Sequence, residues 1–349
     1  MPITHILCAI ALPFLLLGSC NRIPEAAHLS ASPKRIEIMQ GLSFVAPPRP
    51  FADSAMIEVR QSGADWIAVI PYGFTRPGEP KVHFNSQRQW WGERPEGTVA
   101  TIAKARQHGL RIMLKPQVYV PHSWTGAIDF STEADWIAWE NSYRSYLLPM
   151  ARIADSLSVE LFCIGTEFKA ATQKRPDFWR QLIREIRTIY DGPLTYAANW
   201  DEYEQVSFWS DLDYIGIDAY FPLSDEPTPA IADLKKAWQA PRKAMNTVAR
   251  QYNRPYLFTE FGYMSVDSCA HKTWELEKKR RQLNENEQAQ ANALEALFQI
   301  FYDEPAWAGG FLWKWYAHES RRATYRAKDY TPQRKLAAQT LKKWYEKAP

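Results

Sequence analysis

The sequence predicts an α/β protein whose single domain is a (β/α)8 barrel of the TIM type, and three observations support this. Eight short apolar runs bounded by Gly, Pro, Asn or Asp recur along the 349 residues, each followed by a segment with at least weak helical spacing. Parallel neighbouring strands need a crossover between them, and eight such units can close into a barrel. The apolar fraction of 46% is enough to fill one core of that size.

The predicted strands and helices alternate along the chain. Strands are expected over residues 38–45, 66–72, 111–118, 160–166, 194–200, 214–220, 256–261 and 310–315. Helices are expected over residues 54–61, 95–108, 132–156, 176–190, 230–251, 285–302 and 335–345. Capping residues mark some boundaries, with Ser131-Thr132-Glu133 before one helix and His108-Gly109 after another. Residues 201–210, between the fifth and sixth strands, are only weakly helical.

A doubly wound open sheet is the alternative to a barrel. That fold would place a glycine-rich phosphate loop after the first strand, and the sequence has none there. In a barrel, the chemistry lies at the C-terminal ends of the strands, where the loops that follow them gather. Functional side chains are therefore expected at the strand ends.

The N-terminus has the pattern of a targeting segment. Residues 6–17 form an apolar run that is too short to span a bilayer, and it ends in Leu17-Gly18-Ser19-Cys20. This ending resembles a bacterial lipobox, in which signal peptidase cuts before the cysteine and the new N-terminal Cys20 carries the lipid. The expected divisions are a signal peptide over residues 1–19, a tether over 20–36 and the barrel domain over 37–349.

Two details bear on the location of the protein. No Lys or Arg precedes the apolar run, so a plain cleaved signal peptide is the alternative. Asn21 follows the cysteine in place of the Asp that is linked to inner-membrane retention. We therefore expect a secreted lipoprotein at the outer membrane or cell surface of a Gram-negative bacterium, in contact with the membrane through its lipid only.

The composition excludes one class of partner and favours another. The 42 basic and 39 acidic residues give a formal net charge of +3 and form no blocks, so no nucleic acid is expected as a partner. The 15 Trp, 17 Tyr and 16 Phe, many beside turn residues, favour a ligand with flat apolar faces such as a sugar chain. The histidines form no ligand cluster, so neither a metal nor a cofactor is expected. Cys163 lies in an apolar run and is expected to be a buried small hydrophobe.

Two predicted strands end in a glutamate. Glu167 ends the fourth strand and Glu260 ends the seventh. Cleavage of a glycosidic bond needs one carboxyl group to protonate the departing oxygen and a second to attack or stabilise the anomeric carbon. The fourth and seventh strands face each other across a barrel mouth, so the two side chains can converge. A separation of about 5–5.5 Å would mean retention of configuration, and about 6.5–9.5 Å inversion.

Three sequence runs resemble glycoside hydrolase family 113 of the retaining clan GH-A. The runs are Gly165-Thr166-Glu167-Phe168, residues 213–222 (Asp-Tyr-Ile-Gly-Ile-Asp-Ala-Tyr-Phe-Pro) and Thr259-Glu260-Phe261-Gly262-Tyr263. The resemblance covers about residues 37–345. It implies retaining endo-β-1,4-mannanase activity on mannan or glucomannan, with Glu167 as general acid/base and Glu260 as nucleophile. Many members of the clan have Asn before the acid/base, in contact with the sugar 2-hydroxyl, whereas this chain has Thr166.

The chemistry of the two carboxyl groups agrees with these roles. Glu167 must hold a proton near neutral pH, which burial and a nearby anionic Glu260 would favour. Glu260 must stay ionised and needs hydrogen-bond donors, for which Tyr220 at the end of the sixth strand is a candidate. The structural alternative for each glutamate is capping of the following helix or pairing with Lys169 or an Arg.

Further residues at the strand ends and in the loops are candidates for substrate binding. Trp313 resembles the aromatic platform beneath the sugar at the cleavage site, with core packing as the alternative. Trp315 is expected to point the same way along the pleat. The other candidates are Tyr220, Asn199, Trp200, Asp218, Gln117, Lys115, Trp91 and Trp124. Loop anchoring, a surface position for Lys115, and a hydrophobic seal for Trp91 and Trp124 are the alternatives.

The expected function is thus the hydrolysis of a β-linked polysaccharide of the mannan type by a monomer. A β-glucanase or an exo-acting β-mannosidase on the same machinery is the first alternative. A surface lipoprotein that holds glycan without cutting it is the second. The charged stretch over residues 275–287 is expected to be a solvated helix or mobile loop without a catalytic role.

Overall fold

The computed structural model describes residues 1–2, 37–318 and 326–347, which include all eight predicted strands. By its internal contacts the chain divides into Met1–Arg35 and Ile36–Pro349, and the fold is that of the second unit. The predicted apolar run, the lipidated Cys20 and the tether fall within residues 3–36, outside the described residues, so they remain predictions. In the part of the chain that the structure describes, no helix is long and apolar enough to cross a membrane.

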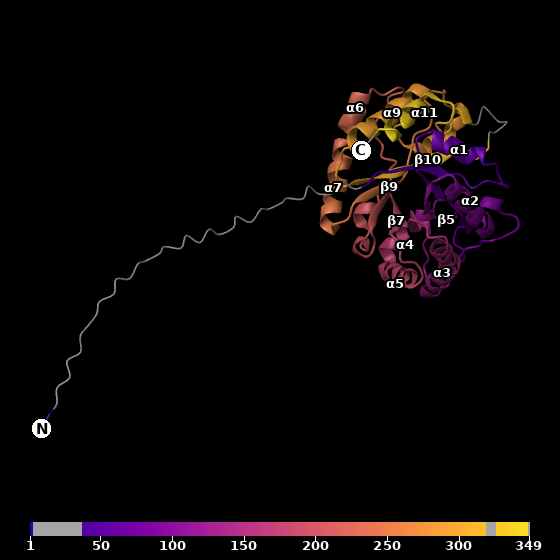
Figure 1. Ribbon diagram of the computed structural model, residues 1–349. Coiled ribbons are helices and arrows are strands. Elements are labelled where there is room, and N and C mark those ends of the chain that lie inside the picture. The colour runs from indigo at the N-terminus through magenta and orange to yellow at the C-terminus, as the bar shows by residue number, and fades with distance from the viewer. Residues whose placement is uncertain (3–36, 319–325, 348–349) are drawn as a thin grey trace. The chain divides into compact units, whose positions relative to one another are not determined.

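Eight parallel strands close into a barrel, which confirms the predicted fold (Figure 1). The strands are β1 (Met39–Phe44), β2 (Trp66–Val69), β4 (Arg111–Leu114), β6 (Leu161–Thr166), β7 (Leu194–Asn199), β8 (Tyr214–Asp218), β9 (Tyr256–Phe261) and β10 (Trp307–Trp315). They neighbour one another in chain order, and β1 pairs with both β2 and β10. This last pairing closes the barrel.

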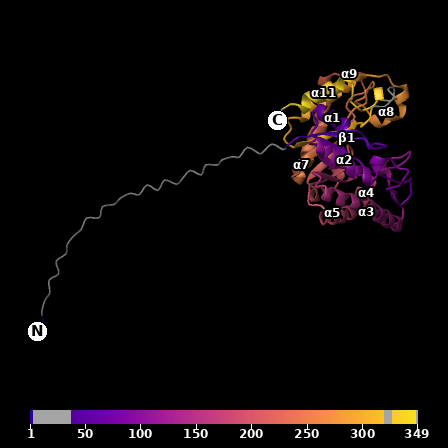
Figure 2. The same cartoon turned by 45° about the vertical axis from the view of Figure 1, so that its right-hand side comes forward.

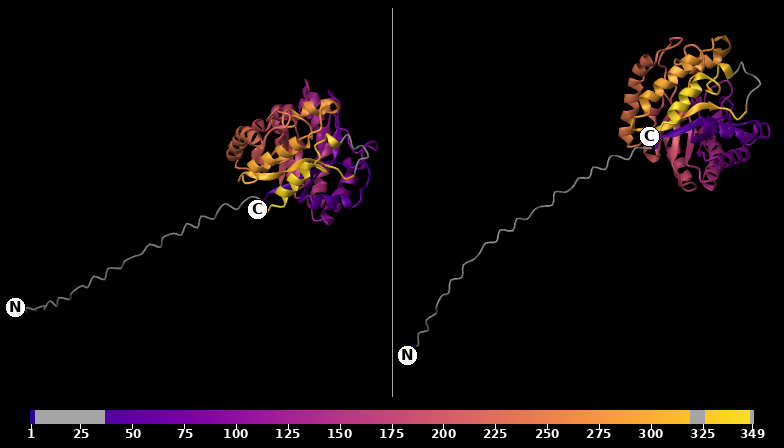
Figure 3. Two further views of the ribbon diagram at one scale, coloured as in Figure 1. Left: turned by 90° about the horizontal axis from the view of Figure 1, so that it is seen from above. Right: turned by 45° about the horizontal axis from the view of Figure 1, so that its top comes forward.

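Helices surround the barrel on all sides (Figures 1 and 2). They are α1 (Ser54–Gln61), α2 (Pro95–Gln107), α3 (Glu133–Ser156), α4 (Lys169–Lys174), α5 (Pro176–Arg187), α6 (Ile231–Ala237), α7 (Gln239–Tyr252), α8 (Thr273–Lys279), α9 (Glu287–Phe301) and α11 (Leu336–Tyr345). The weakly helical segment after the fifth barrel strand contains two short 3-10 helices, Tyr203–Gln205 and Trp209–Asp211. The helices α9 and α11 pack against each other, on the opposite side of the barrel from α3 and α5 (Figure 3).

The helix predicted over residues 230–251 is two helices. The division falls at Trp238, which is fully buried and packs its ring against Phe301 with 5.0 Å between centroids. Two further helices, α4 and α8, were not predicted as such. The segment α8 begins two residues before the charged stretch for which a solvated helix or loop was expected.

The strands predicted over residues 66–72 and 111–118 are each divided in two. Pro71 and Pro116 interrupt them, because proline cannot donate a backbone hydrogen bond. Beyond the prolines, β3 (Tyr72–Phe74) and β5 (Gln117–Tyr119) form a separate parallel pair. This pair continues the barrel wall outward, so Gln117 belongs to an extension above the barrel rather than to the barrel itself.

The core has two layers. One lies inside the barrel and includes Trp66, Met113, Phe311 and Cys163, which is fully buried as expected. The larger one lies between the strands and the helices. Of the 15 tryptophans, only Trp90, Trp124 and Trp274 are exposed. The expectation that the abundant aromatic rings mainly indicate a sugar ligand is therefore wrong for most of them, because they fill this outer layer of the core.

Candidate active site

Glu167 stands at the end of β6 in a backbone conformation that is unusual for a residue with a side chain. Its φ is 55°, in the left-handed region, and holding a non-glycine residue there costs about 1–3 kcal/mol. Three hydrogen bonds hold the turn: Glu167 N–H donates to the Ala197 carbonyl at 2.8 Å, Lys169 N–H donates to the Glu167 carbonyl at 2.9 Å, and Phe168 N–H donates to the Tyr196 hydroxyl at 2.6 Å. The surrounding structure thus fixes the direction of this one carboxyl group.

Glu260, within β9, is surrounded by hydrogen-bond donors. Tyr220 donates its hydroxyl hydrogen to Oε2 at 2.8 Å, so the expected bond from Tyr220 is present. Gln117 Nε2 donates to Oε1 at 2.7 Å, and the Lys115 amine forms an ion pair with the same oxygen. Three donors, one of them cationic, stabilise the ionised form of a carboxyl group that is only 7% exposed.

The environment of Glu167 instead favours the protonated form of its carboxyl group. Burial at the barrel mouth and the negative charge of Glu260 raise the pKa of the Glu167 carboxyl to about 7, while the hydrogen bond from Trp124 Nε1 to Oε2, at 2.6 Å, opposes the rise. The Glu167 carboxyl is therefore about half protonated at neutral pH, while Glu260 is surrounded by three donors. This is the division of environments that an acid and a nucleophile require.

Lys115 and Asp218 lie beneath Glu260 with no exposed surface. Lys115 Nζ is 3.6 Å from Asp218 Oδ1, to which Thr259 also donates at 2.8 Å. Burial lowers the pKa of the Lys115 amine, but attraction to Asp218 and Glu260 outweighs that effect and raises it. The expectation that Lys115 and Asp218 bind sugar hydroxyls is wrong for this structure, because a fully buried group cannot touch a substrate. They act on Glu260, as Gln117 does.

Replacing Lys115 by methionine is expected to destabilise the fold by about 3–5 kcal/mol, because Asp218 would be left buried without a cation. Urea unfolding followed by circular dichroism measures the change. Lys174→Met, which breaks a surface pair with Asp129, is the control and should have little effect. Combining Lys115→Met with Asp218→Asn should recover part of the loss. A Lys115→Met chain as stable as the unaltered one would contradict the role of the ion pair.

The remaining predicted residues divide between the site and the scaffold. Trp124 is 38% exposed and touches Glu167, as described. Asn199 anchors its own loop, because its amide binds Asp201 at 3.0 Å and its oxygen accepts the Trp200 N–H. Trp91 is half-buried against Phe51, with 6.4 Å between ring centroids. For Asn199 and Trp91 the scaffold alternatives thus describe the structure better.

Trp313 and Trp315 do not point the same way. Leu312 pairs with Leu42, but Trp315 pairs with Phe44, so one strand has an extra residue here and the alternation of sides is interrupted. Trp313 is half-buried and also contacts the core inside the barrel, whereas Trp315 packs only in the outer core. The expectation of a common direction is therefore wrong.

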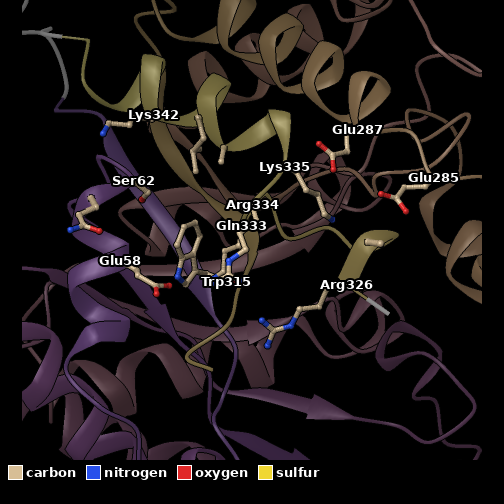
Figure 4. Close-up of a pocket in the computed structure, with 14 residues that line it drawn as sticks. Glu58, Ser62, Glu285, Glu287, Trp315, Arg326, Gln333, Arg334, Lys335 and Lys342 are labelled. Atoms are coloured by element: carbon tan, nitrogen blue, oxygen red, sulfur yellow. The ribbon is translucent and has the colours of Figure 1, made fainter. Parts of the chain in front are cut away.

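Trp315 instead lines a cavity of about 480 Å³ outside the barrel (Figure 4). Figure 4 shows Glu58 and Ser62 on one side of it and Glu287 on the other, with Trp315 and Gln333 between them. Neither Glu167 nor Glu260 lines this cavity. It is separate from the site built on the two glutamates.

Glu202, a fully buried carboxyl group behind Glu167, was not among the predicted site residues. Its oxygens accept hydrogen bonds from Tyr196 and Thr172, each at 2.8 Å, and from the Asn199 backbone at 3.0 Å. Burial raises the pKa of Glu202 to about 7. Because Tyr196 also binds the Phe168 N–H, Glu202 supports the turn that carries Glu167. Two of its partners lie in β7 and the third in α4, and no recognised motif in the sequence marks this arrangement.

The model of Glycoside Hydrolase Family 113 matches residues 48–335. A GH113 β-mannanase from Alicyclobacillus acidocaldarius, solved in complex with ManMIm, is 25% identical with a TM-score of 0.78; the match covers 89% of this chain and 97% of that one. A GH113 β-1,4-mannanase, also solved as a complex, is 24% identical with a TM-score of 0.75 over 90% of this chain and 100% of that one.

More distant structures share the fold alone. A β-glucuronidase from Ruminococcus gnavus is 17% identical with a TM-score of 0.60, and the match covers 89% of this chain but 50% of that one. No curated protein sequence matches the chain.

Proposed function

The chain belongs to glycoside hydrolase family 113, and on that premise we propose that it is a retaining endo-β-1,4-mannanase acting on mannan or glucomannan. Glu167 is the general acid/base and Glu260 the nucleophile in this proposal. The observation that carries it is the contrast between the two carboxyl groups. Glu260 accepts hydrogen bonds from Lys115, Gln117 and Tyr220, whereas the pKa of Glu167 is raised to about 7 by burial and by Glu260.

The reaction proceeds in two displacements at the anomeric carbon. In the first, a Glu260 oxygen attacks that carbon while Glu167 gives its proton to the departing glycosidic oxygen, which leaves as a hydroxyl group. In the second, the ionised Glu167 takes a proton from water, whose oxygen attacks the anomeric carbon and releases Glu260 as a carboxylate. Two inversions give net retention, and Glu167 is protonated again at the end.

Mannose as the sugar is supported by the two family members described above, which are named as β-mannanases. Thr166, next to Glu167, adds no support, because its hydroxyl group is buried in this structure and a buried group cannot touch a substrate.

The test is the release of reducing ends from β-mannan, glucomannan, xylan and β-glucan, with the anomer of the first product followed by NMR. Cleavage of the mannans with retention supports the proposal. Cleavage of β-glucan alone, or of single mannose units from chain ends, would favour the β-glucanase or exo-β-mannosidase alternative. Tight binding of a β-linked glycan without any turnover would favour a non-catalytic surface protein.

The pH dependence should report the proton on Glu167. Because the first displacement needs Glu167 protonated and its pKa is raised to about 7, kcat/KM is expected to fall as the pH rises through about 7. The fall should approach tenfold per pH unit above that value. Trp124→Phe removes the hydrogen bond that lowers this pKa, so its fall should begin at higher pH. Measuring kcat/KM between pH 5 and 9 gives the pH dependence of the unaltered chain and of Trp124→Phe. The same fall above pH 7 in Glu167→Gln would contradict the assignment of this pKa to Glu167.

A further inference from the structure

Two tryptophans are stacked at the rim of the barrel mouth. Trp200 directly follows β7, and Trp274 lies in α8, which comes after β9. Their ring centroids are 5.8 Å apart and their planes differ by 14°. The pair therefore joins the loops of two barrel strands that are not neighbours.

The outer ring of this pair is open to solvent although it is firmly supported. Trp274 is 38% exposed, whereas Trp200 is half-buried and also packs against Phe221 at 5.8 Å. Because Trp200 covers one face of Trp274, the exposed surface is the remaining face and edge. Only three of the 15 tryptophans are largely exposed, and an open indole face that is held in place can stack against a pyranose ring.

The position of the pair relative to the glutamates indicates which part of a glycan it would meet. The nucleophile attacks the anomeric carbon from the side opposite the departing oxygen, so the departing sugar lies on the side of Glu167. Asp201, the residue after Trp200, accepts a bond from Lys169 at 2.7 Å and from Asn199 at 3.0 Å, so the loop of Trp200 is bonded to the segment that follows Glu167. Lys169 is two residues beyond Glu167 in the chain.

The helix α8 has its own connection to the catalytic centre. Tyr330 packs against Tyr220, which binds Glu260, with 6.2 Å between ring centroids. Thr273, the first residue of α8, is buried and lies close to the Tyr330 side chain. Trp274 follows Thr273 in the chain. The contacts that run from Glu260 through Tyr220 and Tyr330 to Thr273 therefore also position Trp274.

We propose that Trp200 and Trp274 form a subsite that stacks on a sugar ring of the β-1,4-linked chain on the leaving-group side of the scissile bond. This inference rests on the proposed function and deepens it. An enzyme with such a platform binds sugars of the polymer on the leaving-group side of the bond it cuts, which favours internal cleavage of long chains. The pair is uncharged, so it recognises the apolar face of the backbone sugar and not a charged substituent.

The experiment compares two substrates in Trp274→Ala. The first is mannohexaose, which extends to the leaving-group side; the second is 4-nitrophenyl β-mannobioside, whose leaving group is not a sugar. The ratio of their kcat/KM values, hexasaccharide over aryl glycoside, should fall about tenfold, corresponding to about 1.4 kcal/mol. Trp274→Phe should keep most of the ratio. Ile137→Ala, which removes a 47% exposed apolar side chain on α3, should not change it.

The outcomes separate this inference from the proposed function. An unchanged ratio in Trp274→Ala, or an equal fall for both substrates, overturns the subsite. If the unaltered chain cleaves cellohexaose and not mannohexaose, the proposed sugar is wrong, and the same ratio with cello-oligosaccharides decides the inference. If it cleaves neither, the proposed function fails. Calorimetric binding of both hexasaccharides to the unaltered and Trp274→Ala chains then decides, and equal affinities, or no binding, overturn the subsite.

Discussion

Replacing Glu260 by alanine is expected to lower kcat on β-mannan by about 10⁴- to 10⁶-fold, because the covalent intermediate cannot form without this carboxylate. The fold should persist, since the Lys115 amine keeps Asp218 as a partner at 3.6 Å. Reducing-end release measures the activity, and thermal unfolding by circular dichroism measures the fold. Glu204→Ala, which removes an exposed carboxyl group, is the matched control and should keep full activity.

A small external nucleophile makes this test specific to the role of Glu260. Azide fits the space that the carboxylate leaves, and it would attack the anomeric carbon of an activated aryl β-mannoside from the same side. The product is expected to be the α-mannosyl azide, with release of the aryl alcohol. Activity within about a hundredfold of the unaltered enzyme, or a β-azide product, would show that Glu260 is not the nucleophile.

The positions of the two glutamates could be predicted because they depend on the order of the strands alone. Each follows a short apolar run, and a barrel of eight parallel units places the ends of the fourth and seventh strands at one mouth. The structure has both residues there, with Glu167 directly after β6 and Glu260 within β9. The register inside each strand did not matter for this prediction.

The residues around the glutamates were harder to predict because their place depends on local irregularities. Pro116 interrupts a predicted strand, which leaves Lys115 beneath Glu260 and puts Gln117 on the outer pair of strands. A register shift at the end of β10 turns Trp315 away from Trp313. Alternation along a strand holds only while the pairing is regular. Pro116 marks the first irregularity in the sequence, whereas the register shift in β10 has no clear mark there.

Apart from the bond between Tyr220 and Glu260, the long-range partners were not predicted. Trp124 reaches Glu167 from a loop 43 residues earlier in the chain, and Trp274, which stacks on Trp200, directly precedes the stretch expected to be a solvated helix or loop. Hydrophobic periodicity predicts which face of an element is buried, but not which loop folds over the mouth. The family resemblance implied the roles of the two glutamates, and the structure identified the residues that surround them.

Replacing Glu167 by alanine is expected to have an effect that depends on the leaving group. On mannan, whose leaving alcohol needs a proton, kcat/KM should fall by about 10²- to 10⁴-fold. On 2,4-dinitrophenyl β-mannoside, whose leaving group departs without a proton, the first displacement should be nearly unimpaired. The second displacement should be slow, because no base activates water, so KM for this substrate should fall together with kcat.

The intermediate that accumulates in Glu167→Ala gives the decisive measurement. Azide needs no base, so it should restore turnover of the dinitrophenyl substrate and yield the β-mannosyl azide, the opposite anomer to that expected from Glu260→Ala. The fall in kcat/KM above pH 7 should disappear as well, because the group whose pKa is raised to about 7 is gone. Equal losses on both substrates, with no response to azide, would assign Glu167 to the scaffold.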